Sequence, residues 1–181
     1  MPYPERVETE RLELRRLEDA DRDAFRAIWT DPAVLAALDP AGAFDPATVP
    51  ERFAHHLRHW REHGFGLWAI EERAGGDPVG WAGATHPTFV PELAHEVEIG
   101  WTLRRAFWGR GLATEAAAAA VEAALTHLEL ERVVSLITPD NRRSIAVAER
   151  LGMRDAGRVR HPDRGFELCV YALSGAAAAP R

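Results

Sequence analysis

Two glycines in a short loop give the clearest chemical signal in the sequence. Gly109 and Gly111 lie in the run Trp108-Gly109-Arg110-Gly111-Leu112-Ala113-Thr114, between an apolar stretch and a long helix-forming stretch. Glycine leaves out the Cβ atom where a ligand could approach the backbone, and the helix that follows begins with unpaired N–H groups and a positive dipole end. Such a loop can bind a phosphate group, although a lone Gly-x-Gly is more typical of a tight turn.

Two familiar nucleotide-binding motifs do not fit this loop. A P-loop requires a Gly-Lys-Ser/Thr ending, which is absent, and the dinucleotide fingerprint requires a third small residue where Thr114 stands. The net charge of −6 argues against general nucleic-acid binding. Arginines nevertheless gather at two places, which suits a discrete anionic ligand or, equally, a solvated surface. They are Arg104, Arg105, Arg110, Arg142 and Arg143.

The elements that must position the loop follow from the hydrophobic pattern. Period-two alternation predicts seven strands, at about 11–15, 65–70, 79–85, 96–103, 132–138, 154–160 and 167–173. Period-3.6 spacing predicts four helices, at about 19–30, 50–64, 112–130 and 141–152. Asp31-Pro32 is expected to end the first helix, and a short apolar turn follows it. We therefore expect an α/β or α+β fold with helices covering a sheet.

Length and composition indicate one domain, residues 1–173, followed by a frayed tail at 174–181. The chain has 181 residues, 46% of them hydrophobic, which is enough for a core that folds alone. No apolar run approaches the roughly 18 residues of a membrane span, and the charged residues 1–11 do not resemble a signal peptide. We expect a cytoplasmic protein that enters no membrane. Cys169, the single cysteine, is interpreted as a core residue.

Three further motifs extend the pattern around the glycine loop. Glu98-Ile99-Gly100-Trp101 precedes it, and Asn141-Arg142-Arg143-Ser144 and Leu151-Gly152-Met153 follow it. In this order and spacing the sequence resembles the GNAT acetyltransferase superfamily. The opening Thr9-Glu10-Arg11-Leu12 and the loop residue Trp108 make it similar to the RimJ/RimL branch, which acetylates the N-termini of ribosomal proteins. The resemblance covers about residues 9–173.

The resemblance implies a GNAT fold, in which a central mixed, mostly antiparallel sheet splays between the strands at 96–103 and 132–138. The pantetheine arm of acetyl-CoA would lie in that gap, with Asn141 hydrogen-bonded to it and the pyrophosphate on the amides from Arg110 to Thr114. Dimers are usual among similar proteins. The implied cofactor-binding residues are Arg105, Gly109, Arg110, Gly111, Leu112, Ala113, Thr114 and Asn141, with no metal.

The implied reaction requires proton transfers. An amine attacks a thioester in its neutral form, yet an alkyl ammonium has a pKa of about 10.4 and an α-ammonium one nearer 8. The resemblance offers Glu98 as the base, directly or through water, and Glu96 shares its side of the predicted strand; a structural role is the alternative. Where many superfamily members keep a proton-donating tyrosine, this chain has Ala148. Ser144 matches a serine of the RimL type that could protonate the thiolate, or it could cap a helix.

The sequence does not specify the acceptor amine, which is a protein N-terminus or a small molecule. His55, His59 and His63 recur every four residues and are interpreted as a polar helix face bordering the acceptor rather than as metal ligands. Two other functions fit the same residues: a non-catalytic acyl-CoA sensor and an unrelated phosphoryl-binding domain. The acyl group itself, acetyl or longer, is also open. Residues expected in the core first and in acceptor walls second are Phe44, Trp60, Trp68 and Trp81.

Overall fold

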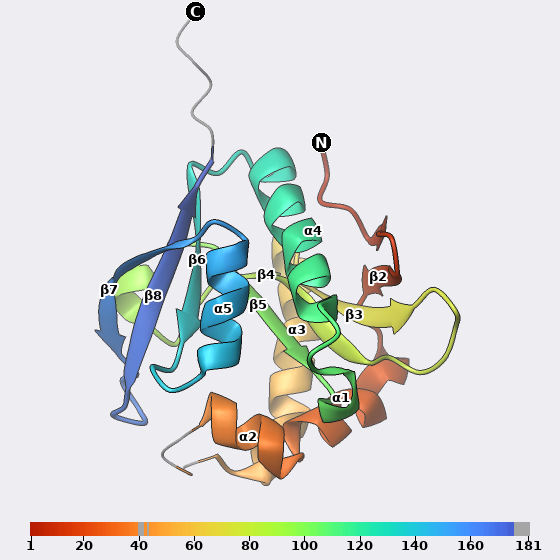
Figure 1. Ribbon diagram of the computed structural model, residues 1–181, viewed down its shortest axis with the longest axis horizontal. Helices are drawn as coiled ribbons and strands as arrows, with labels where there is room; N and C mark the ends of the chain where they lie inside the picture. The colour runs from red at the N-terminus through yellow and green to blue at the C-terminus, as the bar shows by residue number, and fades with distance from the viewer. Residues whose placement is uncertain (40–41, 43, 176–181) are drawn as a thin grey trace, which may run out of the picture.

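One open sheet forms the framework of the computed structural model, which describes residues 1–39, 42 and 44–175 (Figure 1). Within these residues the sheet has eight strands and is accompanied by five α-helices. The strands are β1 (Arg6–Glu8), β2 (Leu12–Arg16), β3 (Leu67–Glu72), β4 (Gly80–Thr85), β5 (Glu98–Leu103), β6 (Arg132–Ile137), β7 (Arg154–Arg160) and β8 (Glu167–Ser174). The helices are α1 (Arg22–Trp29), α2 (Pro32–Leu38), α3 (Val49–His63), α4 (Leu112–His127) and α5 (Arg142–Arg150).

The sheet opens at its centre. The strand order is β1-β2-β3-β4-β5-β6-β8-β7, and every neighbouring pair is antiparallel except β5 and β6. These two parallel strands pair only at Glu98 and Val134. Beyond that point the Ser135 side chain, rather than a backbone amide, donates to the Ile99 carbonyl at 2.6 Å. The predicted splay is therefore present, and one edge of β5 stays free of strand pairing toward its carboxyl end.

Small residues let α4 pack closely on the sheet. Ala116 and Ala120 of α4 belong to the same fully buried core cluster as Ala82 and Ala84 of β4. Because alanine adds only a methyl group beyond the backbone, a helix and a strand that meet through alanines can approach closely. This contact fixes the start of α4 relative to the end of β5.

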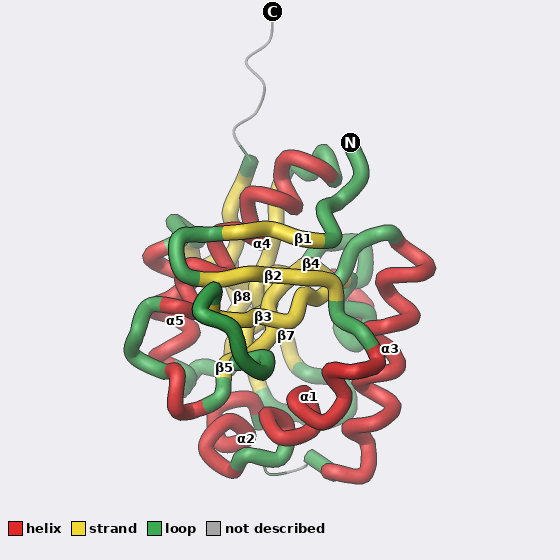
Figure 2. Tube along the Cα trace, turned by 90° about the vertical axis from the view of Figure 1, so that its right-hand side faces the viewer, coloured by secondary structure: helices red, strands yellow, loops and turns green. Residues whose placement is uncertain are grey.

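The opposite face carries a second core, formed with α1 and α3 (Figure 2). Phe25 and Ile28 of α1 and Phe53 of α3 pack there against Trp81 of β4. The α3 helix ends at Gly64, whose φ of 74° is a left-handed conformation that suits glycine. The two faces of the sheet are thus covered by different helices.

Two elements were not predicted from the sequence. The hydrophobic pattern predicts no strand at β1. The Asp31-Pro32 pair predicts a helix end followed by a short turn, whereas the structure has the helix α2 there. In the structure Thr30 closes α1, Asp31 accepts the Ala33 amide at 2.8 Å as the N-cap of α2, and Pro32 is its first residue. Ser174 belongs to β8 rather than to a tail, and residues 176–181 lie outside the described part. Among the described helices, none is long and apolar enough to cross a membrane.

Candidate functional site

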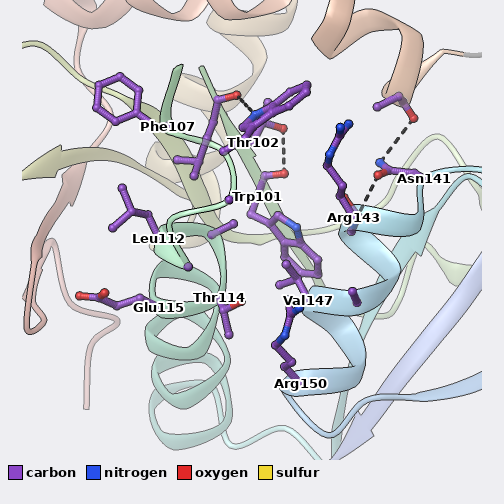
Figure 3. Close-up of a pocket in the computed structure, with 18 of the residues that line it drawn as sticks. Trp101, Thr102, Phe107, Leu112, Thr114, Glu115, Asn141, Arg143, Val147 and Arg150 are labelled. Carbon is purple, nitrogen blue, oxygen red and sulfur yellow. Dashed lines mark hydrogen bonds between the residues drawn. The ribbon is translucent and has the colours of Figure 1, made fainter. Parts of the chain in front are cut away.

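A groove of about 900 Å³ lies where β5 and β6 separate (Figure 3). Its walls come from the end of β5, the loop and first turn of α4, and the facing side of α5, with α2 also contributing. The groove therefore lies beside the free edge of β5. The apolar side chains of its lining include Val34, Leu38, Trp101, Leu103, Phe107, Trp108, Leu112 and Val147.

The backbone at the start of α4 fits an anionic ligand. Gly111 is the N-cap residue of this 16-residue helix and has a φ of 78°. No side chain caps the helix, so the first-turn amides, at Leu112, Ala113 and Thr114, remain available to a ligand. Gly109 also has a positive φ, and a Cβ atom built on it would meet no atom within 4 Å. The loop thus presents N–H donors to open space beside the groove.

Glu115 fastens the glycine loop to the N-terminal strands. Its carboxylate accepts hydrogen bonds from Thr9 Oγ1 at 2.6 Å, the Arg11 amide at 2.8 Å and Arg11 Nε at 2.7 Å. Although burial opposes the effect, these hydrogen bonds lower the pKa of Glu115. Arg11 Nη1 donates in addition to the Arg110 carbonyl at 2.8 Å. The Thr9-x-Arg11 motif therefore supports the loop, a role that the sequence alone did not reveal.

The predicted cofactor-binding residues divide into two groups. Those that line the groove are Gly109, Gly111, Leu112, Ala113, Thr114 and Asn141. Arg105 and Arg110 are exposed and do not line it, and Arg110 forms an ion pair with Glu72 of β3. The arginines that do line the groove are Arg11, Arg142, Arg143 and Arg150. Positive charge thus comes to the groove mainly from α5, where the sequence had marked Arg142 and Arg143 as a basic spot.

Trp108 and Arg143 connect the two walls of the groove. The Trp108 indole N–H donates to the Leu103 carbonyl at 2.8 Å, which fixes the ring at the end of β5. The Arg143 guanidinium lies 4.8 Å from the centre of that ring. A cation over an indole face is attracted by the ring electrons. This contact gives Trp108, the first residue of the loop, a structural role.

Asn141 lies at the start of α5 (Figure 3), and Ser144 follows in the first turn of that helix. Asn141 is the N-cap: its Oδ1 accepts the Ser144 amide at 3.1 Å, and its Nδ2 lies 3.5 Å from the Ala37 carbonyl of α2. The capping role considered for Ser144 is therefore filled by Asn141. Ser144 lines the groove, and its hydroxyl makes no hydrogen bond to the described residues.

Glu98 lies at the point where β5 and β6 begin to separate. The side chain keeps partial exposure, yet withdrawal from water raises the pKa of its carboxyl group to about 7, against a backbone hydrogen bond from Leu136 that favours the ionised form. At neutral pH this carboxylate can therefore accept a proton and release it again. Glu98 is not among the residues that line the groove, whose β5 wall is formed by Trp101, Thr102 and Leu103. A carboxyl group with a perturbed pKa on the strand that forms one wall of a groove is a candidate acid or base.

Glu96 has a different environment from Glu98. It precedes β5 instead of lying in it, so the two glutamates do not share one strand as predicted. Its carboxylate accepts hydrogen bonds from Arg132 Nε at 3.0 Å and from Arg132 Nη2 at 2.6 Å. Because both hydrogen bonds tie the segment before β5 to the start of β6, we assign Glu96 a structural role.

The predicted polar face of α3 is partly buried at His59. His59 Nδ1 donates to the Phe65 carbonyl at 2.9 Å, and Nε2 accepts the His86 amide at 3.1 Å. Burial lowers the pKa of His59 to about 4, so this ring is neutral at pH 7 and ties α3 to the end of β4. Within the described ranges, no group of three or more His, Cys, Asp or Glu side chains could hold a metal ion.

The fold and the groove are those of a known family. Residues 11–154 match the acetyltransferase (GNAT) domain model, which is well over half of the chain. The chain therefore belongs to the GNAT acetyltransferase family. This finding confirms the resemblance stated from the sequence motifs.

Individual relatives agree with this assignment. The "Uncharacterized protein YkkB" of Bacillus subtilis is 31% identical over 156 residues, covering 84% of this chain and 87% of that protein. An acetyltransferase from Agrobacterium tumefaciens has a TM-score of 0.80 at 34% identity and covers 94% of each chain. RimL, a ribosomal L7/L12 α-N-protein acetyltransferase solved with coenzyme A, has a TM-score of 0.70 at 17% identity, covering 96% and 98%. At that identity RimL shows a shared fold alone.

Proposed function

We propose that this protein transfers the acetyl group of acetyl-CoA to a primary amine by direct attack within a ternary complex. The observation that carries the proposal is the position of Glu98: its pKa is raised, and it lies at the β5–β6 pair beyond which β5 runs on, unpaired with β6, to the groove-lining residues Trp101 to Leu103. The acceptors we propose are a small-molecule amine or a protein N-terminus, as in the RimJ/RimL branch.

The groove has the groups that acetyl-CoA requires. Acetyl-CoA supplies an acyl group already activated as a thioester. The amides of Leu112, Ala113 and Thr114 would receive its pyrophosphate, and the free edge of β5 offers backbone groups to the pantetheine arm. The cations that would neutralise its phosphates are Arg11, Arg142, Arg143 and Arg150.

Glu98 and Ser144 would carry the two proton transfers. An alkyl ammonium with a pKa of about 10.4 must lose a proton before attack. A carboxylate with a pKa of about 7 is a much better acceptor of that proton than one with an ordinary pKa, directly or through one water molecule. Ser144 on the facing helix would then donate a proton toward the thiolate, whose conjugate acid has a pKa of about 8.5.

Release of free thiol from acetyl-CoA tests the proposal. We expect saturable thiol release with at least one member of a panel of primary amines, and none without an amine. Saturable binding of CoA with no turnover on any amine would instead identify an acyl-CoA sensor. Equal thermal stabilisation by CoA, ATP and NAD would identify a general phosphoryl-binding domain.

A further inference from the structure

A cluster of aromatic and charged side chains lies on the α1 and α3 face of the sheet. We call it the arginine-aromatic cluster. In Figure 1, α1, α2 and α3 approach one another beside the sheet, and the turn between β7 and β8 lies near the far end of α2. The members of the cluster are Phe25, Trp29, Asp39, Phe44, Arg52, His56, Trp81 and Arg164. None of them lines the groove.

Stacked rings form the centre of this cluster. The Trp29 and Trp81 rings lie 6.0 Å apart at 9°, and Trp29 and Phe44 lie 5.3 Å apart at 20°. The Arg52 guanidinium lies 5.3 Å from the Trp29 ring centre and 5.4 Å from that of Phe44. A flat apolar wall therefore leads from Arg52 to Trp81 on β4.

The cluster has more positive than negative charge. Asp39, whose side chain is only 2% exposed, pairs with Arg164 at 3.3 Å and also accepts the Phe44 amide. Arg52 has no ion pair within the described residues, and residues 40, 41 and 43 are proline and alanines, which have no ionisable side chain. Burial and the charge of Arg164 lower the pKa of Arg52, although Asp39 opposes them. The cluster thus holds two guanidinium groups and one carboxylate, and that carboxylate is paired with Arg164.

Several buried polar atoms in the cluster lack partners. Trp29 Nε1, Trp81 Nε1, Arg52 Nε and His56 Nδ1 have none among the described residues. Burying a polar group without a hydrogen bond costs about 1–3 kcal/mol, so folded proteins rarely leave several together. Three of these atoms are N–H donors on Trp or Arg, which an acceptor of hydrogen bonds would satisfy.

Strand register places the cluster on the same side of the sheet as Glu98. Trp81 of β4 pairs with Thr102, and Thr85 pairs with Glu98. Because side chains alternate along a strand, these four side chains share one face. Gly100 lies between Glu98 and Thr102, and a Cβ atom built there would lie 3.7 Å from Trp81 Cζ3. The wall of rings therefore continues over Gly100 toward Glu98.

We propose that the arginine-aromatic cluster selects the acceptor, and that this acceptor is a small amine whose carboxylate is separated from its amino group by a chain of several bonds. The inference rests on the proposed acetyl transfer to an amine. The amino group would lie near Glu98, the chain would run along the Trp81 and Trp29 rings, and the carboxylate would meet Arg52. A planar guanidinium matches a carboxylate through two parallel hydrogen bonds.

Two features favour a small, elongated acceptor. The Asp39 and Arg164 ion pair joins the end of α2 to the β7–β8 turn, and both side chains lie close enough to Arg52 to influence its pKa, so protein occupies space beside Arg52. The rings of Trp29 and Trp81 separate Arg52 from β5, so an α-amino acid, whose two charged groups are adjacent, is too short to meet both ends.

Four acceptors of graded structure test this proposal: 6-aminohexanoate, 6-aminohexanamide, hexylamine and glycine. We expect kcat/KM in the thiol-release assay to be about 10- to 100-fold higher for 6-aminohexanoate than for the other three, the range for one charge-assisted hydrogen-bond pair. Arg52→Gln should remove most of this preference without changing KM for acetyl-CoA. Arg52→Lys, which retains charge, should keep part of it. Arg58→Gln, on the same helix but paired with Glu51, is the matched control and should keep all of it.

Calorimetric titration of 6-aminohexanoate into the CoA-bound protein separates this proposal from acetyl transfer. Binding that Arg52→Gln weakens about tenfold or more supports the cluster as the carboxylate site even if no amine is acetylated. Equal turnover of hexylamine and 6-aminohexanoate by the wild-type protein would overturn the proposal, and so would the absence of calorimetric binding. The wild-type comparison holds even if Arg52→Gln fails to fold.

Discussion

The groove and the arginine-aromatic cluster present different kinds of chemical groups to the ligands that we propose for them. In the groove, the groups that fit an anion are backbone amides of consecutive residues at the start of α4, next to glycines that keep the space open. In the cluster, the polar groups are side chains from five separate segments that meet only in the folded protein. Backbone recognition leaves a contiguous motif in the sequence, whereas side-chain recognition across segments leaves none.

This difference corresponds to the two ligands that we propose, acetyl-CoA in the groove and an amine acceptor in the cluster. A cosubstrate shared across a family can be bound by main-chain geometry, which many sequences can form. An acceptor that distinguishes one family member from another must be read by side chains. We therefore expect substitutions in the groove to change affinity for acetyl-CoA, and substitutions in the cluster to change the choice of amine.

The largest effect is expected in the groove at Gly111. Gly111→Val places a branched side chain at a φ of 78° and in the space beside Arg11, so the affinity for CoA should fall by about 100-fold or more. Calorimetric titration with CoA measures this loss. Gly75→Val is the matched control, because Gly75 has a φ of 87° in the β3–β4 turn, far from the groove. If both variants bind CoA alike, the backbone account of the groove is wrong.

The next effect is expected at Glu98, the residue that we propose as the base. Glu98→Gln should lower kcat by about 10- to 1,000-fold while KM for acetyl-CoA stays nearly constant. In the wild-type protein kcat/KM should rise between about pH 6 and pH 8, because the carboxyl group with a pKa of about 7 loses its proton there. A pH-rate profile that Glu98→Gln leaves unaltered would remove Glu98 from the mechanism. Glu96→Gln is the control and should change kcat little.

Glu98→Gln should also stabilise the fold above neutral pH. Because the pKa of Glu98 is raised in the folded protein, the folded state binds a proton that the unfolded state releases between about pH 4.5 and 7. Stability is therefore lost as pH rises through that window, and Glu98→Gln removes this loss. At pH 8 we expect a melting temperature about 3 °C or more above that of the wild type, and no gain at pH 4. Equal melting temperatures at both pH values would mean that the carboxyl group is not desolvated.

A smaller effect is expected where the loop is fastened. Glu115→Gln weakens the hydrogen bonds to Thr9 and Arg11, so KM for acetyl-CoA should rise about 2- to 10-fold and the melting temperature should fall by roughly 2–8 °C. Steady-state kinetics and thermal unfolding measure the two changes. Glu122→Gln, an exposed position on the same helix, should change neither. If only the melting temperature changed, the hydrogen bonds of Glu115 would stabilise the fold without contributing to acetyl-CoA binding.

The smallest effect is expected at Ser144. Ser144→Ala should lower kcat about 3- to 10-fold, since a thiolate with a conjugate-acid pKa near 8.5 can leave without a proton donor. Helix stability should not change, because the N-cap of α5 is Asn141. A large loss of melting temperature in Ser144→Ala would contradict this assignment.

Local sequence signals predicted much of the fold. The β3–β4 hairpin, the alanine face of α4 and the glycine loop follow from spacing within single segments. The α2 helix could not be predicted in this way, because Asp-Pro both ends one helix and begins the next, and seven residues hold too few turns for a period to appear. The short β1 strand is visible only through its pairing with β2.

Part of the groove lining could likewise be predicted from the sequence. The residues of the glycine loop and α5 could be identified because they follow one another in the chain. Arg105 and Arg110 are close to the glycine loop in sequence, yet neither lines the groove, and Arg110 pairs with Glu72 instead. Arg52 could not be identified, since its significance depends on a charge balance with Asp39 and Arg164 that only the fold establishes.

Following the label from isotopically labelled acetyl-CoA tests the account most directly. The protein is incubated with acetyl-CoA labelled in the acetyl group and with a panel of primary amines, and the products are identified by mass spectrometry. We expect label in an amide bond on at least one amine, and much less labelled product with Glu98→Gln. Label that stays in acetyl-CoA, or appears only as free acetate while CoA binds normally, would contradict it.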